Sequence, residues 1–344
     1  MAQGKSPRKV GIFGAGLMGK FHAESAASYG ARIVSVYDPR IEAARAVAAK
    51  HGAYAAEDPT DFFDRQLDLV IIATPPAVRV EPVRMACERG IHLLIEKPPA
   101  LRLHDARTCL GLIEKAGVMA GCGFQLRYGS AFEKLRDMLA DQTVHLVRTL
   151  LTTGSYLNAP ANSWYLQKRH SGGSISSDAI HPLDAVRYML NNARCVKAHA
   201  LAVKNMAQDW PDTDCENSVQ VTYELDNGVF GTHMNHSGCE AGDINFEFIG
   251  PHLRLYTIGW GNSSIKGRYK GKDVKEPVTE QSRLGLDKTG AMLRAIETGD
   301  TSLIRSPFSD AIHTMELVEA ANRSILTGQF VRTEGLGREL PVPS

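Results

Sequence analysis

Residues 9–19 read KVGIFGAGLMG, an apolar run followed by three glycines in the spacing G-x-G-x-x-G. The run predicts a short strand, and the composition of residues 18–29 predicts a helix directly after the glycines. Between a strand and a helix, such glycines permit a tight turn, let the backbone approach a pyrophosphate and let the helix pack closely. The first helical turn would add free N–H groups. The residues expected around a pyrophosphate are Gly14, Gly16, Leu17, Met18 and Gly19.

Outside this motif, the first 127 residues alternate between strand-like and helix-like segments. Strands are predicted at 10–13, 32–37, 69–73, 92–95 and 119–124, and helices at 18–29, 41–51, 79–89 and 104–116. The run LVIIA at 69–73 has no polar residue, which is typical of a parallel strand covered on both faces. Strands separated by helices indicate a doubly wound parallel sheet. We therefore assign residues 1–127 to a Rossmann domain that binds a dinucleotide.

A carboxylate stands where the second predicted strand ends, at Asp38. In dinucleotide sites of this kind, an acidic residue at that place binds the ribose hydroxyls. Because Asp38 would repel a 2'-phosphate, we expect NAD rather than NADP as the cofactor. Arg40 works against this preference, since its guanidinium is able to pair with that phosphate.

The pattern changes after Tyr128. Strand-like runs occupy much of 144–153 and 197–270, joined by glycine, proline and Asp-Asn-Gly turns, and they predict a large, mostly antiparallel sheet. Helices are predicted at 132–140, at 177–190, where the pattern is that of an amphipathic helix, at 283–298 and at about 309–327. We assign 128–344 to an α+β domain for substrate binding and oligomerisation. Its few helices are too small to cover both faces of the sheet, so we expect a homodimer or homotetramer.

Composition excludes several classes of partner. The 39 Lys and Arg residues nearly balance 38 Asp and Glu residues, and a net charge of +1 is too small to attract nucleic acid or an anionic membrane. The six cysteines are scattered without a C-x-x-C pair, and no metal site is inferred from them or from the histidines at 233–236. The N-terminus has no apolar signal segment, so the expected location is the cytoplasm. A small-molecule partner is favoured.

Further along the chain, four segments occur in a characteristic order. They are the glycine motif, ATPP at 73–76, Glu96-Lys97-Pro98 after a strand, and GGSISSDAIHPLD at 172–184. Together they resemble the glucose-fructose oxidoreductase, inositol dehydrogenase and MocA family. The resemblance covers nearly the whole chain and extends to the last helix. It implies hydride transfer between NAD and a secondary alcohol or ketone of a sugar, sugar derivative or inositol.

The resemblance also implies further site residues. Those expected near the cofactor are Thr74, Pro75, Glu96, Lys97 and Gln125. Those expected near a sugar or cyclitol substrate are Lys97, Arg127, Tyr128, Ser177, Asp178 and His181. Trp164 joins them because an aromatic ring suits a sugar face; the alternative is a solvated loop with a core tryptophan. Two other functions stay open. The family contains enzymes that retain NAD during isomerisation or glycoside cleavage, and the fold also serves as a non-catalytic dinucleotide or sugar sensor.

Lys97 suits the chemistry of alcohol oxidation, which needs a group that stabilises the developing alkoxide. A lysine at the carboxyl end of a parallel strand would lie over the nicotinamide crevice. Its ammonium does not have to lose a proton for this role. The alternative is a surface lysine that pairs with a neighbouring acid. The resemblance also suggests a cis Lys97-Pro98 bond.

His181 is the candidate general base. On a regular helix, Ser177, Asp178 and Asp184 would all lie within about 60° of His181, on one face. The alternative is a helix start capped by Ser177, with Asp178 favoured by the helix dipole and His181 in the core.

Two positions depart from the family. The family places Asp four residues before the histidine, where this chain has Ser177, so either Asp178 or Ser177 takes that role. Arg79 stands where the family often has histidine after the Thr-Pro turn. Both departures argue against naming a particular substrate by analogy.

Overall fold

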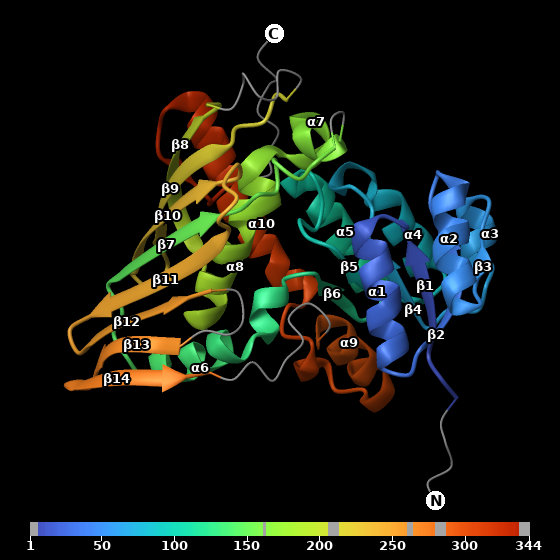
Figure 1. Ribbon diagram of the computed structural model, residues 1–344, viewed down its shortest axis with the longest axis horizontal. Coiled ribbons are helices and arrows are strands. Elements are labelled where there is room, and N and C mark those ends of the chain that lie inside the picture. Colours follow the sequence, from blue (N-terminus) through green and yellow to red (C-terminus); the bar gives the residue numbers. More distant parts are fainter. Residues whose placement is uncertain (1–5, 161–162, 206–212, 260–263, 279–286, 337–344) are drawn as a thin grey trace, which may run out of the picture. The chain divides into compact units, whose positions relative to one another are not determined.

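The computed structural model describes residues 6–160, 163–205, 213–259, 264–278 and 287–336 (Figure 1). Over these residues the chain forms two compact units. The first contains 6–100, 105–125 and 287–309. The second contains 101–104, the described part of 126–278, and 310–336. None of the helices in these ranges combines the length and the apolar composition that crossing a membrane requires.

The first unit is built on a six-stranded parallel sheet with the order β3-β2-β1-β4-β5-β6. Its strands are β1 Lys9–Phe13, β2 Arg32–Tyr37, β3 Tyr54–Ala55, β4 Leu69–Ile72, β5 His92–Ile95 and β6 Ala120–Cys122. Its main helices are α1 Leu17–Ser28, α2 Ile41–His51, α3 Pro59–Phe63, α4 Val80–Glu88 and α5 Leu103–Ala116. All four residues of β4 are fully buried, as its apolar run predicts. The predicted doubly wound Rossmann sheet is confirmed.

The boundary of this unit differs from the division expected from the sequence. The chain returns to the first unit in α9, Asp287–Thr298, which the sequence analysis placed in the second domain. Met292, Leu293 and Ala295 of α9 join the same apolar core as β1 and β4. The predicted start of this helix, residues 283–286, lies outside the described residues.

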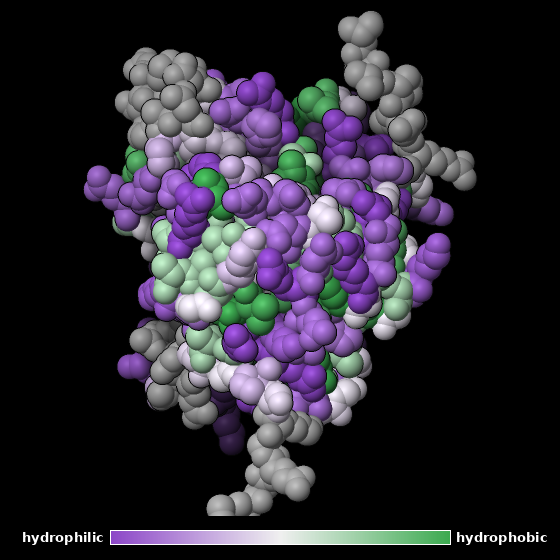
Figure 2. All heavy atoms as spheres, turned by 90° about the vertical axis from the view of Figure 1, so that its right-hand side faces the viewer, coloured by the Kyte–Doolittle hydropathy of each residue, from purple (hydrophilic) through white to green (hydrophobic). Residues whose placement is uncertain are grey.

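Charged side chains cover the helices of this unit where they meet solvent. Figure 2 shows the side that carries α2 and α3, on which hydrophilic residues predominate and apolar ones form smaller areas between them. Exposed ion pairs such as Arg45–Glu42 and Lys50–Glu24 lie on or beside α2. This polar surface agrees with helices that pack one face on the sheet.

The second unit is built on a nine-stranded sheet with the order β14-β13-β12-β11-β7-β10-β9-β8-β15. Its strands are β7 Leu146–Thr152, β8 Cys195–Val203, β9 Ser218–Leu225, β10 Phe230–His236, β11 Asp243–Gly250, β12 Leu253–Ile258, β13 Ser264–Tyr269, β14 Lys272–Pro277 and β15 Val331–Arg332. β7 and β10 pair in parallel, and the other pairings are antiparallel. The predicted, mostly antiparallel sheet is confirmed.

Helices pack on one face of this sheet. They are α6 Ser130–Leu139, α8 Ile180–Met189 and α10 Phe308–Thr327, whereas the short helix α7 Lys168–Ser171 contacts the 3-10 turn Trp164–Leu166. In Figure 1 the strands fan out one beside another, and α8 lies against β7. Phe132 of α6 meets Phe246 of β11 edge to face, with 5.2 Å between the ring centres. The opposite face of the sheet keeps large apolar side chains exposed, Leu150 and Met234 among them.

The helix predicted at 177–190 differs from expectation in two ways. It begins with a π-helical turn, Ile175–Ala179, and continues as α8. Every residue of the turn and of α8 is buried, so the segment is not amphipathic. The reason is that other elements surround it, with α6 and β7 in contact and hydrogen bonds to Thr314 of α10.

Candidate active site

The glycine motif forms the turn between β1 and α1, and its three glycines have different tasks. Gly14 has a φ of +104°, and a Cβ there would lie 2.8 Å from the backbone of Ala73. A Cβ on Gly19 would lie 1.8 Å from the carbonyl oxygen of Gly14. A Cβ on Gly16, by contrast, would meet no atom within 4 Å. Gly14 and Gly19 are therefore required by the fold, whereas Gly16 leaves open space in front of α1, where we expect the pyrophosphate.

Asp38 is fixed directly beside this turn. Its Oδ2 accepts a hydrogen bond from the N–H of Ala15 at 2.9 Å. Its Oδ1 accepts from the N–H and the Nε of Arg40, at 2.9 and 3.2 Å. Asp38 is 7% exposed, while the side chain of Arg40 is 74% exposed. The end of β2 thus presents a carboxylate next to the glycine turn, and Arg40 extends from it into solvent.

The other residues expected near the cofactor also follow strands of the parallel sheet. Thr74 and Pro75 follow β4, Glu96 and Lys97 follow β5, and Gln125 follows β6. Because the strands are parallel, these segments and the glycine turn share the carboxyl edge of the sheet. The sequence-predicted cofactor residues of the first unit are therefore brought to one edge.

Glu96 is the centre of a buried polar cluster that the sequence analysis did not find. Its Oε1 accepts from Nε2 of His22 at 2.9 Å and from the ammonium of Lys288. Nδ1 of His22 lies 3.0 Å from the Thr289 hydroxyl. Gly123 gives the carboxylate room, since a Cβ there would lie 2.9 Å from both of its oxygens. Lys288 and Thr289 arrive from α9, and no spacing in the sequence relates them to Glu96.

The charges of this cluster are set by burial and by the neighbours. Burial alone would raise the pKa of Glu96, but the Lys288 ammonium and the His22 hydrogen bond hold this pKa well below its usual value. Burial and the charge of Lys288 lower the pKa of His22. At neutral pH the cluster therefore contains a carboxylate, an ammonium and a neutral imidazole.

Lys97 is held through its backbone from two sides. Its N–H donates to Oε2 of Glu96 at 3.1 Å, and the Lys97-Pro98 peptide bond is cis, as the family resemblance suggests. The buried Arg79 donates to the carbonyl oxygens of Glu96 and Pro98, the residues on either side of Lys97. Lys97 itself is half-buried. The backbone of this lysine is thus fixed while its side chain keeps some exposure.

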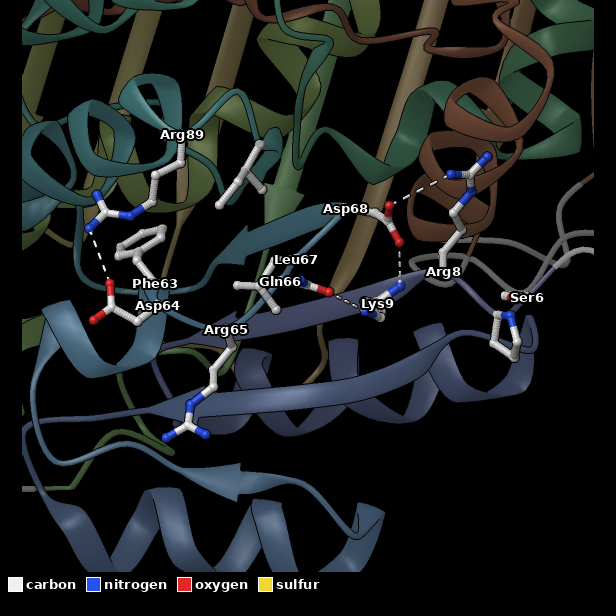
Figure 3. A pocket seen from close by; sticks show the side chains of 12 residues that line it. Ser6, Arg8, Lys9, Phe63, Asp64, Arg65, Gln66, Leu67, Asp68 and Arg89 are labelled. Atoms are coloured by element: carbon white, nitrogen blue, oxygen red, sulfur yellow. Dashed lines mark hydrogen bonds and ion pairs between the residues drawn. The ribbon is translucent and has the colours of Figure 1, made fainter.

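A cavity of about 640 Å³ in the same unit lies elsewhere (Figure 3). Its walls come from residues at or before the amino ends of β1, β4 and β5, the edge opposite to the glycine turn. Arg8 lies 3.7 Å from Asp68, and Arg89 lies 3.5 Å from Asp64. Since its cations face carboxylates and its position is the amino edge, this cavity is not the expected cofactor site.

In the second unit, hydroxyl groups surround the carboxylate of Asp178. Tyr165 donates to Oδ1 at 2.6 Å, and Ser155 and Ser237 donate to Oδ2 at 2.7 and 2.6 Å. Burial and the charge of Asp178 raise the pKa of the Tyr165 hydroxyl well above its usual value, which keeps it a donor. Ser155 and Ser237 were missed by the sequence analysis because they come from distant segments.

The turn and helix that carry the candidate base differ from the regular helix assumed earlier. Ser177 and Asp178 belong to the π-helical turn, whereas His181 belongs to α8. A constant step of 100° per residue therefore does not relate their directions. All three are buried, with His181 9% exposed. Asp184, expected on the same face, instead binds Arg127 and the Thr314 hydroxyl.

Arg127, expected to contact substrate, lies in a buried ion cluster. It is fully buried and donates to Asp184 at 2.7 and 2.8 Å and to Asp310 at 2.6 Å. Arg187 pairs with the same Asp310 at 2.9 Å. Two carboxylates thus occupy the guanidinium that the sequence analysis assigned to substrate. Of the other expected substrate residues, Tyr128 is buried and Trp164 is 41% exposed.

Family models match most of the chain. Residues 8–124 match the oxidoreductase family with an NAD-binding Rossmann fold, and residues 132–255 match the GFO/IDH/MocA C-terminal domain. The chain belongs to the Gfo/Idh/MocA family. As a member of this family it is an oxidoreductase with an NAD-binding domain, which confirms the resemblance, the fold class and the cofactor expected from the sequence.

Curated relatives agree with this family, and a solved structure agrees with the fold. D-glucoside 3-dehydrogenase of Escherichia coli is 29% identical over 250 residues, which is 69% of either chain. The NAD⁺-dependent scyllo-inositol 2-dehydrogenase of Bacillus subtilis is 27% identical over 72% of this chain and 73% of its own. An inositol dehydrogenase homologue from Azotobacter vinelandii, solved with NAD⁺, has a TM-score of 0.82 at 17% identity and covers 95% of this chain and 97% of its own.

Proposed function

We propose that this protein is an NAD-dependent dehydrogenase or ketoreductase that acts on a secondary alcohol or ketone of a sugar, sugar derivative or inositol. The observation that carries the proposal is the hydrogen bonding that fixes the Lys97 backbone at the carboxyl edge of the Rossmann sheet. Glu96 accepts from the Lys97 N–H, and Arg79 donates to the carbonyl groups on either side of Lys97. The names of the relatives, a glucoside dehydrogenase and an inositol dehydrogenase, support this substrate class.

The residues divide the chemistry between them. When bound, NAD would accept the hydride that leaves the carbinol carbon. The ammonium of Lys97 stabilises the negative charge that develops on the substrate oxygen. His181 accepts the hydroxyl proton. Asp178 keeps Tyr165 in place through a 2.6 Å hydrogen bond, and we assign it a positioning role.

We further propose that the exposed face of the large sheet forms an interface with a second copy of this chain. Phe230 of β10 pairs in register with Leu146 of β7, and Met234 pairs with Leu150, all four exposed. Residues at alternate positions share a face, so these side chains form one apolar surface. A hollow of about 350 Å³ beside Met234 and Leu201 belongs to it. An apolar face of this kind is typical of an oligomer interface.

Light scattering tests the interface. The wild-type protein is expected to have at least the mass of a dimer at micromolar concentration, and Met234→Lys to shift it toward the monomer. The matched control is Tyr54→Lys, an exposed aromatic residue of the first unit. A monomeric wild-type protein would refute the interface.

All six cysteines are free thiols, and we propose a cytoplasmic location on that basis.

The activity is tested by incubating the purified protein with NAD or NADP and a panel of polyols, inositols and sugars. We expect reduced nicotinamide to accumulate, as measured by its absorbance, with at least one cyclitol or sugar and NAD. Lys97→Ala is the matched control, because it is expected to bind NAD through the glycine turn but to turn over slowly. NAD binding without turnover of any panel member in either direction would contradict the proposal.

A further inference from the structure

Arg79 is an unusual residue in this site, because its buried guanidinium serves only backbone carbonyl groups within the described part of the chain. The residue precedes α4 and is 2% exposed. Its Nε and Nη2 donate to the carbonyl oxygen of Thr74 at 3.2 and 2.7 Å. Its Nη1 donates to the carbonyl oxygens of Glu96 and Pro98. A single side chain therefore connects the segments that follow β4 and β5.

The bonds of Arg79 bracket Lys97 in the sequence. The carbonyl oxygens on both sides of the lysine point to the same nitrogen, and the Lys97 N–H is held by Glu96. A neutral histidine has one ring N–H donor and cannot serve three carbonyl groups, whereas arginine has five N–H donors in a fixed plane. Arginine at this position therefore makes contacts to the backbone on both sides of Lys97 that a histidine could not make together.

The charge of Arg79 is not needed for these contacts. Among the described residues, no carboxylate oxygen lies within ion-pair distance of the guanidinium. Burial lowers the pKa of Arg79 to about 10, which still leaves it protonated at neutral pH. A buried cation without a paired anion costs folding free energy, so a purely structural clamp would be better made from neutral donors.

We propose that Arg79 is a positioning residue for Lys97, which fixes the lysine through the carbonyl oxygens of Glu96 and Pro98 and places a second positive charge at the edge where the substrate oxygen becomes negative. The inference rests on the proposed function, in which Lys97 stabilises that oxygen. It adds a residue of this chain to the machinery and explains why a cation is kept in a buried place.

The first experiment needs no substrate. Lysines are reductively ¹³C-methylated, which keeps their charge, and the Lys97 NMR signal is assigned by its loss in Lys97→Arg. In the wild-type protein this signal should be distinct from those of the exposed lysines. In Arg79→Gln it should move toward them, while the exposed Arg84→Gln control on α4 should leave it unchanged. An unchanged Lys97 signal in folded Arg79→Gln would overturn the proposal.

The second experiment uses the panel substrate with the highest turnover. Arg79→Gln should lower kcat at least about tenfold while KM and the NAD dissociation constant change less than about threefold, because the loss concerns the transition state. Arg79→Lys, which keeps the charge, should recover part of kcat and replaces Arg79→Gln if that variant does not fold. A lower melting temperature with wild-type kcat would show a merely structural role. If no panel member is turned over, the proposed function fails, and the NMR result alone decides on Arg79.

Discussion

The Oε1 atom of Glu96 lies 2.9 Å from Nε2 of His22, and both side chains are buried. The same oxygen binds the ammonium of Lys288, which comes from α9. The residue that holds the N–H of Lys97 is thus itself held by the far end of the unit's chain. The carboxylate of Glu96 therefore contributes both to the stability of the unit and to the geometry at Lys97.

Removing the cation of this cluster should destabilise the protein strongly. Lys288→Met leaves a buried carboxylate without its ammonium, which typically costs about 3–5 kcal/mol of unfolding free energy. The loss should shrink on acidification. Without the charge of Lys288, burial raises the pKa of Glu96 in the variant, so protonation at lower pH removes the uncompensated buried charge there. In the wild-type protein this pKa stays well below 4.5 and the paired carboxylate remains charged at pH 4.

Urea unfolding at pH 7 and at pH 4 measures both effects. The control is Lys50→Met, which breaks the exposed Lys50–Glu24 pair and should leave the unfolding free energy nearly unchanged, because solvent screens such a pair. A Lys288→Met loss that is equally large at both pH values would mean that Glu96 does not carry the charge assigned to it.

His233 in β10 should make the second unit sensitive to acid. It is fully buried, and burial lowers its pKa from 6.5 to about 3. Since the unfolded state binds a proton more readily, stability falls as the pH drops below 6.5 and continues to fall until about 3. At pH 4.5 the loss is expected to reach roughly 2–3 kcal/mol.

The change His233→Gln should therefore flatten the decline of stability between pH 7 and pH 4.5. The exposed His252→Gln serves as the control and should leave the decline as it is. Identical pH profiles for the wild-type protein and a folded His233→Gln would contradict the prediction.

Gly16 separates cofactor binding from folding. A methyl group there meets no protein atom, so Gly16→Ala should keep the melting temperature of the wild-type protein. The methyl group would lie in the space expected for the pyrophosphate, and NAD should bind at least about tenfold more weakly. Gly111→Ala is the matched control in α5, also with open space around its Cβ. If calorimetry finds equal NAD affinity for both variants, the pyrophosphate does not bind at the Gly16 turn.

The carboxylate of Asp38 should set the preference for NAD. We expect the wild-type protein to bind NAD more tightly than NADP. Asp38→Asn keeps one oxygen for the N–H of Ala15 but removes the charge, and should reduce this preference at least about tenfold. Asp64→Asn at the opposite edge of the sheet is the control. Tighter binding of NADP by the wild-type protein would contradict this prediction and would indicate that Arg40 pairs with the 2'-phosphate.

His181 should be the base. His181→Ala is expected to lower turnover by roughly 10² to 10⁴, the usual contribution of a positioned acid-base group. Asp178→Asn should cost at least about tenfold, and more than Ser177→Ala, because Asp178 anchors Tyr165 through a charged carboxylate whereas Ser177 offers a neutral hydroxyl. Wild-type turnover of a folded His181→Ala that still binds NAD would show that the histidine is structural.

Local patterns in the sequence were sufficient for the Rossmann sheet. Its signals are local in sequence: the glycine motif, the apolar run at β4, and the positions of Asp38 and Lys97 at the ends of predicted strands. The parallel order of the strands then determines that Thr74, Lys97 and Gln125 share an edge. These features follow from periodicity and from the chirality of parallel connections.

Contacts between distant segments could not be predicted in the same way. Nothing near Asp178 in the sequence indicates that Ser237 will bind it, and nothing near Lys288 indicates Glu96. The π-helical turn before His181 has no signal in the pattern, because its residues suit a regular helix as well. The ion cluster of Arg127 has no local signal either, because its partners, Asp184 and Asp310, are 57 and 183 residues away.

The return of α9 to the first unit has a consequence for synthesis on the ribosome. Domains generally fold as they emerge, the N-terminal one first. Here the nascent first unit lacks Lys288 and the apolar residues of α9 until strands β7 to β14 of the second unit have been made. In the second unit, the ion cluster of Arg127 and Arg187 is complete only after Asp310 of α10 has been synthesised. Both units therefore reach completion only when the last helices emerge, and a chain that ends before residue 287 should be recovered as an aggregation-prone fragment.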